Sequence, residues 1–155
     1  MSATKRRRAD GEQTRATILD AATKLATLEG LDGLSIGRLE ALCENFFGYL
    51  EQPVFPGGCF FASATAELDT HPGPVRERLV ESLDGWLALI ERRVREAQEA
   101  GELDTSEDPA LLAFELDAFM KMGNSLRVLH GGRSGLERAR VAVAARLERA
   151  RVTKA

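Results

Sequence analysis

The sequence has 155 residues, a formal net charge of −3 and two cysteines. This length allows one good core with a small head, but not two full enzyme domains. No stretch approaches the roughly 20 apolar residues of a membrane-spanning helix, and the basic start has no apolar core behind it, so we expect a cytoplasmic protein. Cys43 and Cys59 have neither CxxC spacing nor a neighbouring histidine, which predicts buried free thiols and no metal site.

Charge is distributed unevenly along the chain. Residues 40–130 hold 17 acidic residues against 7 basic ones, whereas residues 131–155 are basic. The start is also basic, through Lys5, Arg6, Arg7, Arg8 and Arg15. A basic arm ahead of an acidic body predicts contact with a polyanion at the front end only, and a solubilising tail is the alternative.

Every periodic segment repeats at helical spacing, which predicts an all-α fold. An apolar stripe over residues 12–29 predicts a first helix that ends at Gly30. Residues 35–50 form a second helix, for which Ser35 is the expected N-cap. A shorter apolar segment covers residues 59–68. The inward face of the second helix is expected to be Ile36, Leu39, Cys43, Phe46, Phe47 and Leu50.

Three longer helices follow, each with its own start signal. Residues 74–100 begin with a proline in the first turn and end before Gly101. Asp108 is the expected N-cap of a helix over residues 109–130, which Gly131 ends. Ser134 and Glu137 have the spacing of a capping box at the start of the last helix.

The last two helices are joined by a short turn and form an αα-hairpin. Their apolar residues have the spacing of a bundle seam, so two hairpins from two copies would close a four-helix dimer interface. The alternative is that the same residues close the core of one chain. The predicted interface residues are Leu126, Leu129, Leu136, Val143 and Leu147.

Six sequence stretches resemble the TetR (tetracycline repressor) family of transcriptional regulators. The opening of its DNA-binding domain is resembled by TRATILDAA at 14–22, LATLEG at 25–30 and GLSIGRL at 33–39. Its regulatory domain is resembled by ALCENFF at 41–47, PGGCFFA at 56–62 and DPALLAF at 108–114. The resemblance covers nearly the whole chain. It implies a partial helix-turn-helix head over 1–39 and a helical ligand-binding and dimerisation domain over 40–155.

The sequence departs from the family between Leu39 and Glu40. Family members place a recognition helix with a Gly-x-x-Tyr-x-x-Phe type pattern and a linker helix at this point, whereas the only tyrosine here is Tyr49. A natural deletion, an engineered one or an omitted flexible segment would each produce this join. The helix that reads base edges is therefore missing, and the remaining candidates contact phosphates only. These candidates are Lys5, Arg6, Arg7, Arg8, Arg15, Ser35 and Arg38.

The resemblance also implies a cavity for an apolar or aromatic small molecule among the body helices. Ordinary core packing of the same residues is the alternative. The expected polar contacts are Asn45, Ser63 and Asn124. The expected lining residues are Cys43, Phe46, Phe47, Phe60, Phe61, Leu83, Trp86, Phe119 and Met122.

No constellation of residues indicates an enzyme or a cofactor. His71 lies in a turn and His130 precedes a glycine cap, where a cation at a helix end explains it. There is no Glu-x-x-His pair, nucleophile elbow or phosphate loop. The resemblance thus implies a homodimeric, ligand-responsive regulator, usually a repressor. The alternative is a dimeric small-molecule-binding or interaction module that has lost sequence-specific DNA binding.

Overall fold

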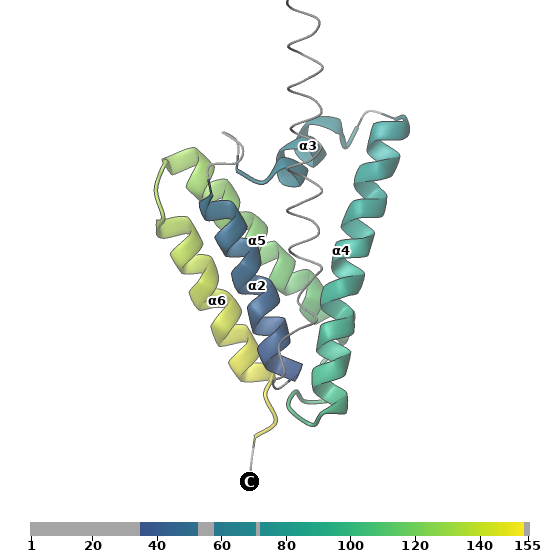
Figure 1. Ribbon diagram of the computed structural model, residues 1–155, viewed down its shortest axis with the longest axis vertical. Coiled ribbons are helices and arrows are strands. Elements are labelled where there is room, and N and C mark those ends of the chain that lie inside the picture. The colour runs from purple at the N-terminus through teal and green to yellow at the C-terminus, as the bar shows by residue number, and fades with distance from the viewer. Residues whose placement is uncertain (1–34, 53–57, 71, 154–155) are drawn as a thin grey trace, which may run out of the picture. The chain divides into compact units, whose positions relative to one another are not determined.

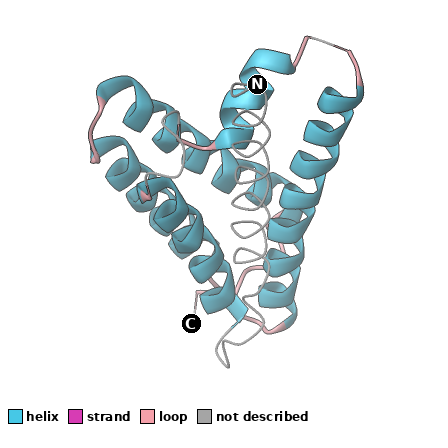
Figure 2. Cartoon of the chain, turned by 45° about the horizontal axis from the view of Figure 1, so that its top comes forward, coloured by secondary structure: helices cyan, strands magenta, loops and turns pink. Residues whose placement is uncertain are grey.

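The computed structural model describes residues 35–52, 58–70 and 72–153, which all lie in one compact unit, Asp32–Ala155. These residues contain no strand, only an isolated antiparallel bridge between Leu103 and Arg151, and the predicted all-α fold is confirmed (Figure 2). The helix predicted over residues 12–29 lies outside the described residues. The helices are α2 (Ser35–Glu51), α3 (Phe60–Leu68), α4 (Pro74–Glu99), α5 (Pro109–His130) and α6 (Ser134–Ala150) (Figure 1).

Three helix boundaries that depend on local chemistry lie where the sequence predicts them. Asp108 caps α5, its Oδ1 accepting hydrogen bonds from the amides of Ala110 (2.9 Å) and Leu111 (3.4 Å). Gly131 ends α5 with a φ of 70°, the left-handed conformation that glycine adopts without strain. α4 begins at Pro74, whose missing N–H has no helical partner to lose at that position.

Two predicted N-caps are absent. Ser35 is the first residue of α2 rather than its cap, and the Ile36 amide donates to the Oε2 of Glu102 at 2.7 Å. Glu102 follows α4, and its backbone oxygen accepts from the Val152 amide at 3.2 Å. At α6 no side chain caps the first turn, so Ser134 forms no capping box. A carboxylate from a distant turn replaces the local cap of α2.

α2 crosses the Leu39–Glu40 junction as one continuous helix. The chain divides into two compact units, and the division falls after Leu31, ahead of this junction. The apolar residues on both sides of the junction are buried on one face, as the periodicity predicts. The junction therefore lies inside a helix of the body, and Ser35 and Arg38 belong to this same helix.

α5 is the central helix of the unit. It packs against α2, α4 and α6, and its residues Leu112, Leu116 and Met120 are completely buried. Burial of each such side chain contributes roughly 1.5–3 kcal/mol of transfer free energy. In Figures 1 and 2, α2 and α4 converge at the end where α2 begins and diverge at the end where α3 lies.

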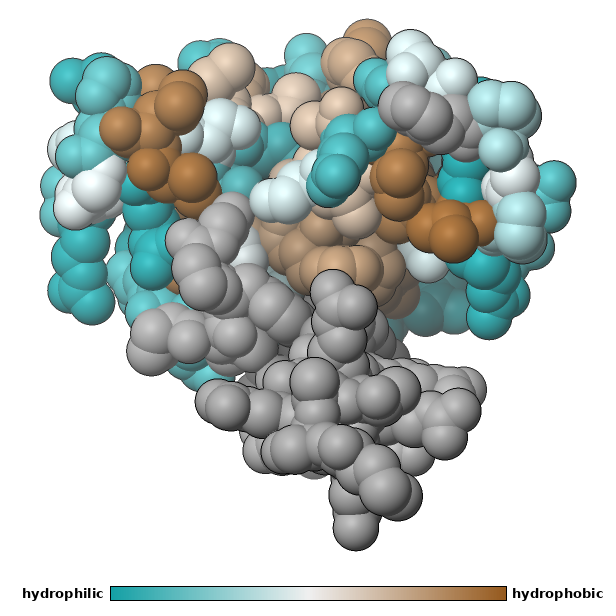
Figure 3. Space-filling view, turned by 90° about the horizontal axis from the view of Figure 1, so that it is seen from above, coloured by the Kyte–Doolittle hydropathy of each residue, from teal (hydrophilic) through white to brown (hydrophobic). Residues whose placement is uncertain are grey.

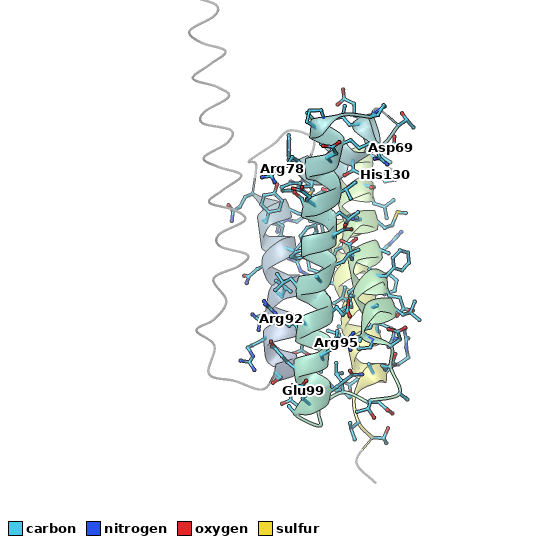
Figure 4. The ribbon with its side chains drawn as sticks, turned by 90° about the vertical axis from the view of Figure 1, so that its right-hand side faces the viewer. Asp69, Arg78, Arg92, Arg95, Glu99 and His130 are labelled. Atoms are coloured by element: carbon cyan, nitrogen blue, oxygen red, sulfur yellow. The ribbon has the colours of Figure 1, made fainter. Side chains whose placement is uncertain are left out.

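Two arginines of α6 bind carboxylates on the neighbouring elements. Arg140 contacts Glu51 at 3.0 Å and Glu44 at 2.8 Å, which joins α6 to α2. Arg146 contacts Glu107, beside the start of α5, at 2.5 Å. The hydrogen bonds that Arg146 donates to both oxygens of Glu107 lower the pKa of this carboxyl. The outward face of α4 is also charged, through Arg78, Arg92, Arg95 and Glu99 (Figure 4). Among the described helices, none is long and apolar enough to cross a membrane.

α5 and α6 approach each other at two glycines. A Cβ placed on Gly123 would lie 2.6 Å from the Cβ of Ala139. A Cβ placed on Gly135 would lie 2.6 Å from the Cβ of Leu126 and 3.0 Å from the Arg127 nitrogen. These distances are shorter than van der Waals contact, so the helix pair requires glycine at both positions.

Gly135→Ala should therefore lower the free energy of unfolding by about 1–3 kcal/mol, because the added methyl group meets Leu126 and the backbone of α5. Gly85→Ala is the matched control, since a Cβ there meets nothing within 4 Å. At this exposed helical position alanine should stabilise by up to about 1 kcal/mol. Urea unfolding followed by circular dichroism measures both changes. Equal unfolding midpoints for the two variants would contradict the close approach of α5 and α6.

Candidate functional site

Two polar side chains of α5 are almost completely buried. Asp117 is 5% exposed and Asn124 is 3% exposed. They are seven residues apart, which places them on the same face of the helix. We call the group formed by Cys59, Trp86, Asp117, Lys121 and Asn124 the polar cluster.

Both carboxylate oxygens of Asp117 are bonded. Oδ1 accepts a hydrogen bond from Trp86 Nε1 at 3.0 Å, which joins α4 to α5. Oδ2 lies 2.7 Å from the Lys121 ammonium one turn further along α5. The Lys121 side chain is 38% exposed, whereas the Asp117 side chain is 8% exposed. The carboxylate is therefore enclosed, and its counter-ion reaches the solvent.

Asn124 fixes the turn that precedes α3. Its Oδ1 accepts a hydrogen bond from the Cys59 amide at 3.0 Å. Gly58 has a φ of 76°, and a Cβ there would lie 2.3 Å from the same Oδ1. Only glycine combines this conformation with such a close approach, so the Gly58–Cys59 turn holds the start of α3 against α5.

Aromatic side chains flank the polar cluster. The ring of Phe46 lies 5.6 Å from that of Trp86 and 6.3 Å from that of Tyr49. Burial raises the pKa of the Tyr49 phenol, and the charge interaction with Cys59 acts in the same direction. Leu83 and Leu87, on α4 near Trp86, are only half-buried. Figure 3, which looks down on the end where α3 lies, shows apolar residues gathered at its centre.

Neither cysteine is chemically activated. Burial raises the pKa of the Cys43 thiol to about 12. Burial also raises the pKa of Cys59, although the Lys121 charge acts in the opposite direction. Since the thiolate is the nucleophilic form, both residues act as apolar side chains near neutral pH. Among the described residues, no group of three or more His, Cys, Asp or Glu residues is placed to hold a metal ion.

The structure brings together only some of the lining residues predicted from the sequence. Phe46 and Trp86 are in contact, and Leu83 lies on the same helix as Trp86. Phe60 and Phe61 meet edge to face at 5.6 Å on α3, and each is more than a third exposed.

Four predicted lining residues lie elsewhere or in the core. The guanidinium of Arg140 lies 4.9 Å above the Phe47 ring, which places Phe47 of α2 against α6. Cys43 is also on α2 and is buried in the core. Phe119 precedes Leu126 by two turns of α5, on the side that meets α6. Met122 is 59% exposed, away from the polar cluster.

Of the three polar contacts expected from the sequence, only Asn124 is in the site, because Asn45 and Ser63 are exposed. Asp117, Lys121 and Tyr49 were not predicted from the sequence. A signal for the first two was present, since a carboxylate inside an apolar helix needs a partner, and Lys121 stands four residues later.

Residues 35–143 match the family described as "Tetracyclin repressor-like, C-terminal domain". The chain belongs to the TetR family. A TetR transcriptional regulator from Chloroflexus aurantiacus J-10-fl is similar in structure, with a TM-score of 0.78 and 22% identity over 92% of this chain and 71% of that one. The reduced form of E. coli NemR has a TM-score of 0.71 and 20% identity over 92% and 72% of the two chains. None of the curated proteins matches the sequence.

The DNA-contact residues expected from the TetR resemblance fall in two groups. Ser35 and Arg38 lie on the first turn of α2, where Arg38 Nη2 donates to the Ser35 hydroxyl at 3.0 Å. The others lie outside the described residues, and they are Lys5, Arg6, Arg7, Arg8 and Arg15.

The residues expected at a dimer interface from the apolar seam of the last two helices also divide. Leu129 is 78% exposed, and Leu126 is half-buried beside Gly135. Three α6 residues, by contrast, are in the core of their own chain, as the alternative interpretation has it. Helical periodicity identified the apolar face of α6 but not the partner that covers it. The three core residues are Leu136, Val143 and Leu147.

The Cys43 thiol gives a pH dependence of definite sign. Burial raises its pKa from 9.0 to about 12, and Glu40 and Glu44 add to the rise. Between these values the unfolded chain ionises the thiol while the folded chain keeps it protonated. The contribution of this thiol to the free energy of unfolding is therefore fully present below pH 9.0, and it is lost as pH rises toward about 12. Urea unfolding of Cys43→Ala should show a shallower loss of stability over this window than the unchanged chain. Parallel curves would contradict the burial of this thiol.

Proposed function

We propose that this TetR-family chain is a ligand-responsive transcriptional regulator, of the repressor type and acting in the cytoplasm. The observation that carries the proposal is the enclosed Asp117 carboxylate beside half-buried apolar residues of α4. Small-molecule sites combine apolar walls with a few fixed polar groups, and the polar cluster together with the flanking Phe46, Leu83 and Leu87 has this composition. We assign it a binding role and not a catalytic one, because burial raises the pKa of the Cys59 thiol and both oxygens of the Asp117 carboxylate have partners within the chain.

The contacts also suggest how the site acts on the rest of the chain. Trp86 ties α4 to Asp117, and Glu102, which follows α4, caps the first turn of α2. A ligand that changes the spacing of α4 and α5 would therefore shift Glu102 relative to α2. Because α2 is the first helix of the body in sequence, this shift would couple ligand binding to the start of the body.

We further propose that the chain forms a dimer through the outward face of α5 and α6. Four apolar residues of α5 are more than half exposed, and they are spaced three, eight and seven residues apart, which gathers them into one stripe. A continuous stripe of uncovered apolar side chains marks a protein contact, and a second copy of the chain supplies an identical apolar face. The face consists of Leu111, Phe114, Met122, Leu129 and Val141, each more than half exposed.

Phe114→Glu combined with Met122→Glu should give a monomer, because a dimer would have to bury both carboxylates unpaired. Val75→Glu on α4 is the matched control, since Val75 is as exposed as Met122, at 59%. Light scattering after size exclusion measures the mass. We expect the double variant to lose half the mass of the unchanged chain while the control keeps it. An unchanged mass in the double variant would overturn this interface.

DNA binding separates the proposed regulator from a binding module without DNA affinity. With no recognition helix between Leu39 and Glu40, we expect weak binding with little sequence preference that fades steeply with salt. Changing Arg6, Arg7 and Arg8 together to alanine should abolish it, because these arginines supply most of the few phosphate contacts that remain.

The matched control changes three outward arginines of α4, Arg78, Arg92 and Arg95, to alanine (Figure 4). Fluorescence anisotropy on a random-sequence duplex across a salt series measures both triple variants. Equal losses in the two variants would show that charge alone matters and not the arm. No binding at low salt would favour the alternative module, and tight sequence-specific binding would contradict the missing recognition helix.

A further inference from the structure

The polar cluster has a definite charge arrangement, from which we infer its ligand class. We propose that Asp117 binds a protonated aromatic amine, which takes the place of Lys121 on the carboxylate. This inference rests on the ligand-binding function proposed above and names the chemistry of that site.

The two oxygens of Asp117 differ in how firmly they are bonded. Oδ1 is held by the indole of Trp86, which itself packs on Phe46. Oδ2 is held by Lys121, whose side chain is flexible and 38% exposed. Lys121 can therefore release the carboxylate when its side chain rotates and moves the ammonium group into the solvent, whereas Trp86 stays in place.

Only a cation can replace Lys121 without leaving the carboxylate uncompensated. An ammonium group would exchange one positive charge for another, so the enclosed carboxylate keeps a counter-ion throughout. A neutral hydroxyl would leave the negative charge of Asp117 without a cation. An anion would be repelled by Asp117 and by the net negative charge of residues 40–130, which contain 17 acidic and 7 basic residues.

The surroundings of the carboxylate favour an aromatic group on this amine. Trp86 and Phe46 lie with their ring centroids 5.6 Å apart beside Asp117, and ring faces attract cations. Leu83 and Leu87 of α4 are half-buried, so an apolar ring that covers them gains free energy from their burial. One molecule with a ring next to its ammonium group satisfies both parts of the site.

Three probes of nearly equal size distinguish the possible ligand charges. They are 2-phenylethylammonium, its neutral isostere 2-phenylethanol, and the anion 3-phenylpropanoate. Binding to the full chain is followed by the fluorescence of Trp86, which is the one tryptophan of the sequence and lies in the site. We expect the ammonium probe to bind at least tenfold more tightly than the alcohol.

Substitutions then assign the preference to individual residues. Asp117→Asn keeps an oxygen for Trp86 but removes the charge, and it should bring the affinity for the ammonium probe within about twofold of that for the alcohol. Lys121→Met removes the competing ammonium and should tighten binding of the cation several-fold. Asp84→Asn removes an exposed carboxylate of α4 and should leave the preference unchanged. Circular dichroism of each variant confirms that the helices are formed.

The outcomes separate this inference from the proposed function. A cation preference that survives Asp117→Asn, or that Asp84→Asn removes equally, would overturn the assignment to Asp117. Tighter binding of the anion, lost in Lys121→Met, would assign the site to carboxylate ligands instead. If none of the probes binds, the amine site is wrong, while DNA binding measured on the same chain would still test the regulator.

Discussion

The carboxylate of Asp117 is a charge placed inside an apolar helical bundle, and it constrains the elements around it. An unpaired carboxylate at this depth would cost several kcal/mol, so the fold has to supply donors from nearby. Trp86 supplies one from α4, and Lys121 supplies the other from the next turn of α5. The same helix face carries Asn124, which fixes the turn before α3. The positions of α3 and α4 around α5 thus depend on two buried polar residues.

The three sides of α5 have different physical roles. The side with Asp117 and Asn124 meets α3 and α4 through hydrogen bonds. The side with Gly123 meets α6 at a distance that only small residues permit. The outward side is apolar and exposed, and we propose that a second copy covers it. A change at the polar side therefore acts directly on α4, which the Trp86 hydrogen bond joins to α5.

Most features that depend on neighbouring residues could be predicted from the sequence, although the capping box expected at Ser134 does not form. Features that depend on distant residues could not be predicted. The cap at Asp108 and the glycine at 131 are local, and both were predicted correctly. The cap of α2 comes from Glu102, far away in the sequence, and Ser35 was assigned that role wrongly. Periodicity identified the inward faces of the helices. It could not tell that α5, rather than a second chain, covers Leu136, or that Met122 faces outward.

The hydrogen bond between Trp86 and Asp117 joins α4 to α5 at the buried carboxylate, and NMR tests it directly. The proton–nitrogen spectrum should contain one indole resonance, because the chain has one tryptophan. We predict that this indole proton exchanges slowly with water, and that Asp117→Ala shifts its resonance far more than Asp84→Ala does. An indole proton that exchanges as fast as in the urea-unfolded chain, with equal shifts in the two variants, would contradict the account.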